Sequence, residues 1–110
     1  NILILGITFK ENCPDIRNTK VVDIYTTLHE YSSNITVYDS WADQEKVERE
    51  YNIRILSSGL ENLQNSFDAV ILSVAHDEFK ELPIQKFLKN NGVIYDVKGV
   101  LEKALVDGRL

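Results

Sequence analysis

The stretch Ala69-Val70-Ile71-Leu72-Ser73-Val74 is the most apolar run in this chain, and it decides the fold class. A run that is short, β-branched and nearly continuous in its apolar character is typical of a strand buried on both faces of a parallel sheet. The run Ile2-Leu3-Ile4-Leu5, which ends at Gly6, has the same character. Further short runs, each ended by turn residues, lie at Ile35–Tyr38, Ile53–Leu56 and Gly92–Tyr95. We therefore predict five strands.

Patterns typical of helices lie between these strands. In the segment Thr19–Tyr31 the apolar side chains fall on one stripe, and Asn18 or Thr19 can cap its start. The other predicted helical segments are Ala42–Tyr51, which is mostly charged, Leu60–Asn65, Asp77–Leu82 with Pro83–Lys89, and Val100–Leu105. The alternation predicts an α/β fold, a Rossmann-like three-layer αβα sandwich around a parallel five- or six-stranded sheet of order 3-2-1-4-5.

Length and composition indicate one domain. The 110 residues include 12 Lys and Arg and 17 Asp and Glu, and the net charge of -5 argues against nucleic-acid or anionic-membrane partners. A single cysteine excludes a disulfide framework and a Cys-rich zinc site. No apolar run approaches the roughly 20 residues of a membrane-spanning helix. We expect a cytoplasmic protein, and, because Asn1 is followed at once by a strand, we expect residues 1–110 to be a domain of a longer protein.

The loop that follows the first strand is the longest connection in the chain. In an open parallel sheet, ligands bind at the carboxyl ends of the strands where the strand order reverses, here between the first and fourth strands. Only Gly6 remains of the Gly-x-Gly-x-x-Gly dinucleotide fingerprint, because Thr8 and Glu11 stand where the other glycines would be. This departure disfavours NAD binding by this domain alone.

Positive charge gathers in the same loop. Lys10, Arg17 and Lys20 lie within eleven residues, and Lys98 follows the fifth strand on the same edge of the sheet. A cationic cluster near a helix N-terminus is suited to phosphate. In the alternative interpretation the lysines are merely solvated and Arg17 pairs with an acidic neighbour.

Residues 6–24 read Gly-Ile-Thr-Phe-Lys-Glu-Asn-Cys-Pro-Asp-Ile-Arg-Asn-Thr-Lys-Val-Val-Asp-Ile, and this stretch resembles the opening of the C-terminal, UDP-binding domain of the UDP-glucose/GDP-mannose dehydrogenase family. Residues 37–39, 75–79 and 94–101 resemble the same domain in the same order, so that the resemblance covers nearly the whole chain. Within this family, the residues of these stretches are similar to those of bacterial enzymes that oxidise UDP-N-acetylhexosamines for capsule, O-antigen and other surface polysaccharides.

This resemblance implies that residues 1–110 are the C-terminal fragment of an NAD-dependent UDP-sugar 6-dehydrogenase. Such an enzyme oxidises the sugar C6 alcohol to a carboxylate in two steps, consumes two NAD, and forms a homodimer or larger assembly through a central domain. NAD would be bound mainly by an N-terminal domain. The nucleophilic cysteine would lie outside this fragment, which we therefore expect to be inactive alone. The resemblance leaves open which UDP-N-acetylhexosamine, or UDP-glucose, is oxidised.

The resemblance also implies roles for individual residues. Phe9 and Lys10 match the pair that contacts the UDP-sugar, and Lys98 stands where many members have a substrate-contacting arginine. A lysine keeps the charge of that arginine but not its planar fork. Arg17 matches an arginine that touches NAD across the domain cleft, and we expect Asp15 to orient it as an ion pair. No residue is assigned a catalytic role or a metal.

Four further residues have structural interpretations. Cys13 is interpreted as a buried or loop thiol, and Asp39 as a turn or cap residue, although a ribose-binding acid would occupy its position in an NAD domain. His76 is interpreted as a helix-capping or loop residue, with contact to a ligand as the alternative, and Trp41 as a packing residue, with an interdomain contact as the alternative.

An alternative function is a stand-alone α/β regulatory module of the receiver or flavodoxin type. A receiver needs an acidic pair after its first strand, where this chain has Gly6-Ile7-Thr8. A flavodoxin needs a phosphate loop rich in Ser, Thr and Gly, which Thr8 alone does not provide.

Overall fold

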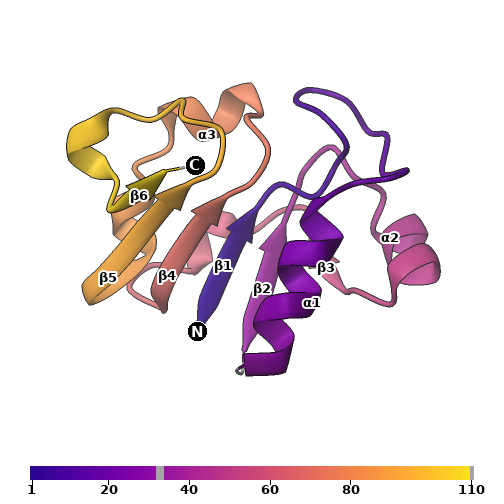
Figure 1. Cartoon of the computed structure of the whole chain (residues 1–110), viewed down its shortest axis with the longest axis horizontal. Coiled ribbons are helices and arrows are strands. Elements are labelled where there is room, and N and C mark those ends of the chain that lie inside the picture. Colours follow the sequence, from indigo (N-terminus) through magenta and orange to yellow (C-terminus); the bar gives the residue numbers. More distant parts are fainter. Residues whose placement is uncertain (32–33, 110) are drawn as a thin grey trace.

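The computed structural model describes residues 1–31 and 34–109, which form a six-stranded parallel sheet flanked by helices (Figure 1). The order across the sheet is β3-β2-β1-β4-β5-β6. The strands are β1 (Ile2–Leu5), β2 (Ile35–Tyr38), β3 (Ile55–Leu56), β4 (Phe67–Leu72), β5 (Leu88–Asp96) and β6 (Gly108–Arg109). Each neighbouring pair is parallel. The predicted αβα fold and the order 3-2-1-4-5 are confirmed, and β6 extends the sheet.

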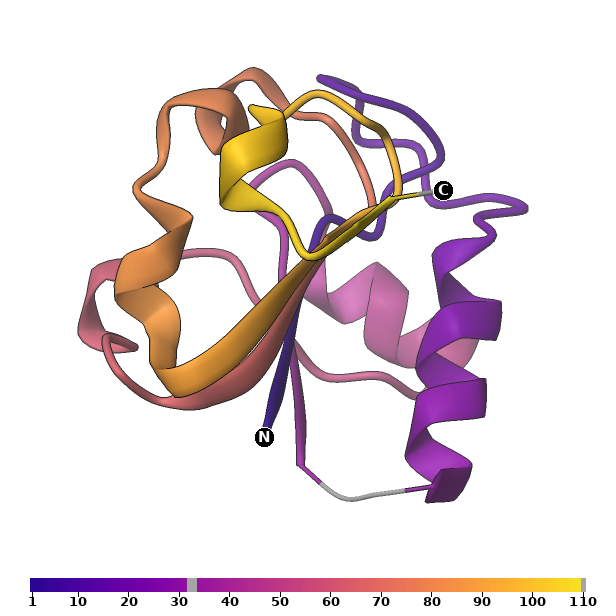
Figure 2. The ribbon, with the colours of Figure 1, turned by 60° about the vertical axis from the view of Figure 1, so that its left-hand side comes forward.

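Helices cover the two faces unequally. The helices α1 (Val21–Tyr31) and α2 (Gln44–Tyr51) lie on one face, over the half of the sheet that contains β1, β2 and β3 (Figures 1 and 2). The opposite face carries α3 (Asp77–Glu81) and the 3-10 turns η1 (Leu60–Asn62) and η2 (Ile84–Phe87). A last 3-10 turn, η3 (Lys103–Leu105), precedes β6.

Several predicted boundaries are wrong, although each strand exists. The fourth strand ends at Leu72 rather than Val74, because the N–H groups of Ser73 and Val74 both turn to the Leu5 carbonyl. The third strand is shortened to Ile55–Leu56, and the fifth is lengthened to Leu88–Asp96 because Leu88 pairs with Phe67 across a register shift.

The predicted helices also change in extent. The first begins at Val21, whose N–H donates to the Thr19 hydroxyl, so Thr19 caps the first turn. The segments Leu60–Asn65, Pro83–Lys89 and Val100–Leu105 are reduced to 3-10 turns. In the second of these, a helix cannot continue because β5 begins at Leu88.

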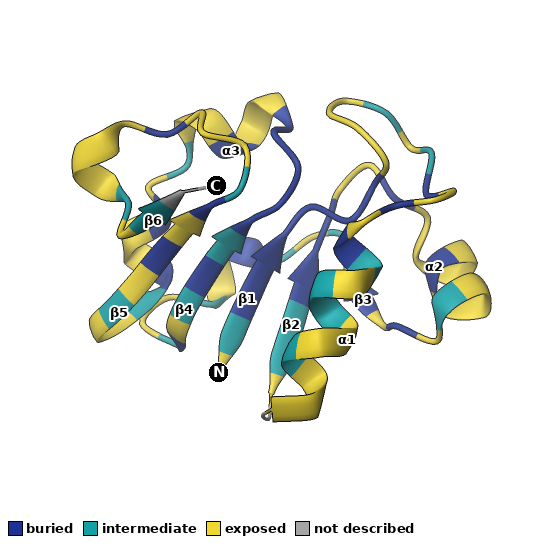
Figure 3. Ribbon diagram, viewed as in Figure 1, coloured by how far each residue is buried: buried dark blue, intermediate teal, exposed yellow. Residues whose placement is uncertain are grey.

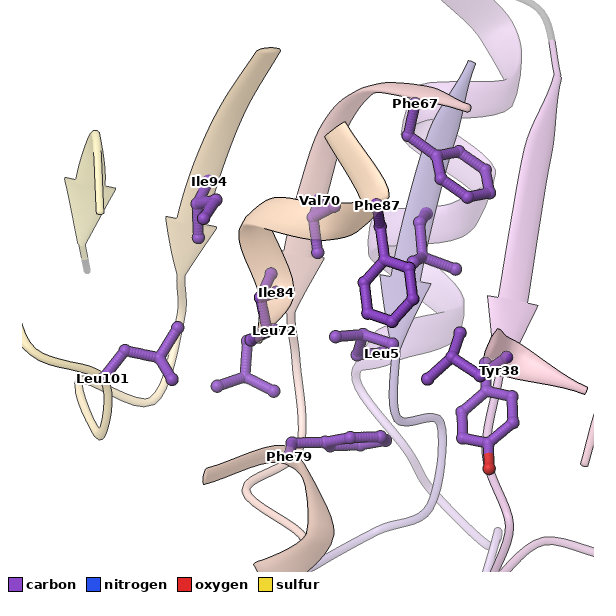
Figure 4. Packing of buried hydrophobic residues seen from close by; sticks show 12 residues of the cluster. Leu5, Tyr38, Phe67, Val70, Leu72, Phe79, Ile84, Phe87, Ile94 and Leu101 are labelled. Atoms are coloured by element: carbon purple, nitrogen blue, oxygen red, sulfur yellow. The ribbon is translucent and has the colours of Figure 1, made fainter. Parts of the chain in front are cut away.

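Each face of the sheet has its own hydrophobic cluster. Leu5, Tyr38, Leu72 and Phe79 belong to the cluster on the α3 side, where their side chains meet those of η2 (Figure 4). Val21 and Val47 belong to the cluster beneath α1 and α2. Burial is deepest in the central strands and in the loops at their carboxyl ends (Figure 3). The loops that form the expected ligand-binding edge therefore begin with buried residues.

Candidate functional site at the carboxyl edge of the sheet

The loops that follow β1 and β4 meet at the predicted reversal of strand order. Gly6 has a φ of 96°, and a Cβ atom placed there would lie 2.6 Å from the Cβ of Val74. No L side chain fits this approach without a shift of the backbone. The single surviving glycine of the fingerprint thus packs one loop on the other, and it does not open a cradle for a pyrophosphate.

Asp39, at the end of β2, is the centre of a buried hydrogen-bond network. Its Oδ2 accepts hydrogen bonds from the N–H groups of Ile7 at 2.7 Å and Thr8 at 3.1 Å. Its Oδ1 accepts from Trp41 N–H at 2.7 Å and Ala42 N–H at 3.1 Å. The predicted turn role is confirmed, and the carboxylate additionally fixes the start of the β1 loop.

His76 joins the β4 loop to the same carboxylate. Asn12 N–H donates to His76 Nδ1 at 2.8 Å, so in the neutral ring Nε2 carries the proton. Nε2 then donates to Asp39 Oδ2 at 2.9 Å, with Thr8 Oγ1 at 3.3 Å. Asn12 Oδ1 in turn accepts the N–H of Asp77 at 3.0 Å. The predicted loop role of His76 is confirmed, and the ring connects three strand ends.

Complete burial makes these bonds necessary. The side chains of Asp39 and His76 have no solvent exposure. Burial raises the pKa of Asp39, but the hydrogen bonds from His76 and from Ile7 N–H outweigh it, and the pKa of Asp39 lies below its ordinary value. The Trp41 ring stacks on the imidazole at a centroid distance of 6.0 Å, which confirms its packing role, and 43% of Trp41 stays exposed. Sequence reasoning missed this pair, although both residues end strands that were predicted to flank the first.

The loop presents Phe9 and Lys10 to solvent from a fixed backbone. Phe9 N–H donates to the Asp15 carbonyl at 2.6 Å, and the Thr8 hydroxyl donates to the Lys10 carbonyl at 2.9 Å. The Phe9 side chain is 55% exposed, and Lys10 is exposed. An exposed cation and an exposed aromatic ring on an ordered loop are suited to bind an anionic ligand with a planar base.

Arg17 forms the predicted ion pair with Asp15. Nε donates to Oδ1 and Nη2 to Oδ2, each at 3.0 Å, and the hydrogen bonds from Arg17 lower the pKa of Asp15 to about 2. A groove of about 500 Å³ adjoins this pair, and Lys46 and Arg49 of α2 also line it. Cys13 lies half-buried in the same loop, as predicted.

Lys98 lies on the same edge beyond β4. Its N–H donates to Oδ1 of the buried Asp96 at 3.0 Å, and the N–H of Gly99 donates to the same atom at 2.8 Å. Gly99 has a φ of 69°, a conformation that favours glycine. The side chain of Lys98 is exposed. β4 separates the loop of Lys98 from the loop of Lys10 in the sheet.

Two further features bear on function. Among the residues that the structure describes, no group of three His, Cys, Asp or Glu side chains could hold a metal ion. None of the helices in residues 1–31 and 34–109 combines the length and the apolar character needed to cross a membrane.

The fold and this edge define a class of protein: a Rossmann-like α/β domain with ordered loops at the reversal of strand order. Residues 3–103 match the model of the UDP-glucose/GDP-mannose dehydrogenase family, UDP binding domain, so the chain belongs to that family. This membership leaves the receiver or flavodoxin alternative without support.

Two curated relatives carry the name UDP-N-acetyl-D-glucosamine 6-dehydrogenase. The one from Salmonella typhi is 44% identical and is matched over 100% of this chain and 26% of its own length. The one from Pseudomonas aeruginosa is 43% identical over 99% of this chain and 26% of its own length. The chain thus spans about a quarter of these relatives.

A solved structure of the UDP-N-acetyl-mannosamine dehydrogenase Cap5O from Staphylococcus aureus shares the fold. Its TM-score is 0.70 at 22% identity, over 98% of this chain and 25% of that chain.

Proposed function

We propose that this chain is the C-terminal UDP-binding domain of a longer, cytoplasmic NAD-dependent nucleotide-sugar 6-dehydrogenase. The observation that carries the proposal is the 44% identity, over the whole chain, to a relative named UDP-N-acetyl-D-glucosamine 6-dehydrogenase. The full-length enzyme would oxidise the C6 alcohol of a UDP-N-acetylhexosamine to the uronic acid in two steps, for surface polysaccharide biosynthesis. We propose a homodimer or larger assembly for it.

The role proposed for this domain is to hold the nucleotide away from the reacting carbon. Lys10 and Lys98 would place positive charge beside the diphosphate, and Phe9 would offer an apolar wall. Binding energy from a remote, non-reacting part of the substrate can position the reacting carbon. The buried network beneath Phe9 and Lys10 supports this role, because it orders their loop before a ligand arrives.

The loop that follows β1 does not fit a pyrophosphate cradle for NAD. Val74 occupies the space beside the Cα of Gly6, which a pyrophosphate would need. Thr8 is buried, and its hydroxyl donates a hydrogen bond to the Lys10 carbonyl. Arg17 is exposed and lines a groove with Lys46 and Arg49, as well as with Asp15 and Glu50, and its exposed guanidinium supports a contact to an NAD molecule held elsewhere in the enzyme. We assign no oxidation step and no catalytic residue to this chain.

A calorimetric titration of the full-length protein with UDP tests the proposal. Lys10→Gln should weaken UDP binding more than about tenfold, because it removes a charge-assisted contact to phosphate. Lys89→Gln is the matched control: Lys89 lies at the amino end of β5, on the opposite edge of the sheet, and UDP affinity should not change. Wild-type affinity in Lys10→Gln would reject the assigned site. Titration of residues 1–110 alone with NAD should show no binding.

A further inference from the structure

One face of β4 and β5 is apolar where a solvent-facing strand would be polar. The residues that point to this face are Ala69 and Ile71 from β4 and Val93 and Tyr95 from β5. Ala69 pairs with Val93, and Ile71 with Tyr95, so the four side chains form one continuous patch. Val93 is 45% exposed and Tyr95 38%.

The helices of this chain leave that patch uncovered. α1 and α2 lie over the other half of the same face, and no helix of the described residues stands in front of β4, β5 and β6 (Figures 1 and 3). A groove of about 480 Å³ runs between α1 and the patch. Ile24, Thr27 and Leu28 line it from α1. Ile71 and Tyr95 line it from the sheet, and Val97 lines it from the bend that follows β5.

Parallel sheets are normally buried on both faces, whereas one-sided sheets alternate apolar and polar residues along each strand. In β4 and β5 the buried face carries Val70, Leu72 and Ile94, and the opposite face is also apolar. The alternation expected for contact with water is therefore missing at these positions. The sequence of the two strands indicates that a further layer covers this face.

We propose that an amphipathic α-helix from the part of the polypeptide outside residues 1–110 lies in this groove beside α1. This inference rests on the proposed function, in which the chain is one domain of a longer enzyme. The relatives have about three quarters of their length outside the matched region, which can supply such a helix.

The dimensions of the site favour a helix of the same polypeptide. Neighbouring helices pack about 8–10 Å apart, and α1 already forms one wall of the slot. A stable dimer interface needs about 800 Å² from each partner, far more than these few side chains expose. A segment of the same polypeptide needs less area because its effective concentration is high. Asp23, which is exposed, also lines the groove, so we expect Lys or Arg at the edge of the apolar stripe of the helix.

Photo-crosslinking in the full-length protein tests the inference. Tyr95→p-benzoylphenylalanine places the reactive group in the groove, and Tyr31→p-benzoylphenylalanine is the matched control, because Tyr31 is 83% exposed at the end of α1. Tyr95 should give a product of monomer mass whose linked peptide lies outside residues 1–110 and has apolar residues at helical spacing. Tyr31 should not link to that peptide. A product of dimer mass, a link to another protein, a link only within residues 1–110, or no product would overturn the inference.

A second variant guards against local effects of the crosslinker. Val93→Lys should lower the Tm of the full-length protein, because it places a charge in the apolar patch that borders the groove and that the docked helix would cover, and Tyr31→Lys should leave it unchanged. An unchanged Tm in Val93→Lys would overturn the inference. UDP titration of the same preparations separates the two proposals. Retained UDP binding without a crosslink rejects the helix and keeps the proposed function, whereas a crosslinked protein that does not bind UDP rejects the proposed function.

Discussion

Two acidic residues at the carboxyl edge, Asp39 and Asp15, each pair with a basic side chain and each have a lowered pKa. Asp39 and His76 are completely buried and lie 37 positions apart in the sequence. Asp15 and Arg17 lie two positions apart, and the Arg17 side chain is 84% exposed. The first pair ties loops from three strands together, and the second organises one bend of a single loop.

Both carboxylates are held in the ionised form, but only the buried one is expected to contribute strongly to stability. The pKa of a carboxyl group falls wherever its ionised form gains hydrogen bonds, whether the group is buried or exposed. A contribution to stability needs more, because an exposed pair loses little when it is broken and water replaces the partner. The buried carboxylate has no such replacement, so its partners determine whether the β1 loop keeps its shape.

The largest expected effect is that of Asp39→Asn. The two carboxylate oxygens accept five hydrogen bonds between them, and an amide has only one accepting oxygen, so at least two bonds are lost. We expect the free energy of unfolding to fall by about 3–5 kcal/mol, measured by urea denaturation. Asp15→Asn is the control and should leave it nearly unchanged. Equal effects at the two positions would contradict the comparison.

A smaller loss is expected for His76→Phe. The aromatic ring can still pack against Trp41 and Phe79, but the bonds to Asp39 and to Asn12 N–H disappear. We expect a loss of about 2–3 kcal/mol, since the bond to the charged carboxylate is the larger one. Hydrogen exchange of the Asn12 amide should become faster, whereas the Val70 amide in β4 should keep its protection relative to global unfolding. Unchanged exchange at Asn12 would show that the ring does not hold the loop.

The fold could be predicted from local patterns because its strands are visible in the sequence as short apolar runs. Ile2–Leu5 and the run around Val70 are apolar enough to be central, and the alternation with helices then leaves few topologies. Boundaries were less predictable, since they depend on pairing. Leu88 joins β5 only because Phe67 lies beside it across a register shift.

The candidate site was predictable where it is local. The pair of Asp15 and Arg17 could be proposed from sequence because two positions separate its members. The bond from His76 to Asp39 could not, because it depends on how three loops pack above the sheet. The roles of Phe9, Lys10, Lys98 and Arg17 toward ligands stay predictions.

Acid should weaken the buried network by a moderate amount. The folded-state pKa of Asp39 is depressed, so its contribution is fully present above the unfolded pKa near 4 and is lost as the pH falls through the folded value. Between pH 5 and pH 3, protonation of this group should therefore lower the unfolding free energy, by less than the substitutions at Asp39 and His76 do. Urea denaturation at both pH values should therefore show a smaller difference between the wild type and Asp39→Asn at pH 3. A difference that grows in acid would reverse the sign and contradict the assignment.

The smallest expected effect on stability is that of Arg17→Gln. The bidentate pair is exposed, so its loss should not shift the Tm measurably. The pKa of Asp15 should nevertheless rise from about 2 toward 3.8, because the side-chain hydrogen bonds from Arg17 are the largest cause of its depression, while the hydrogen bond from the N–H of residue 17 is kept. An NMR titration of the Asp15 carboxyl measures this change, with Asp39 of the same sample as the internal reference, since its partners are untouched. A Tm that falls as far as in His76→Phe would show that the exposed pair also holds the loop, and the distinction between the two pairs would fail.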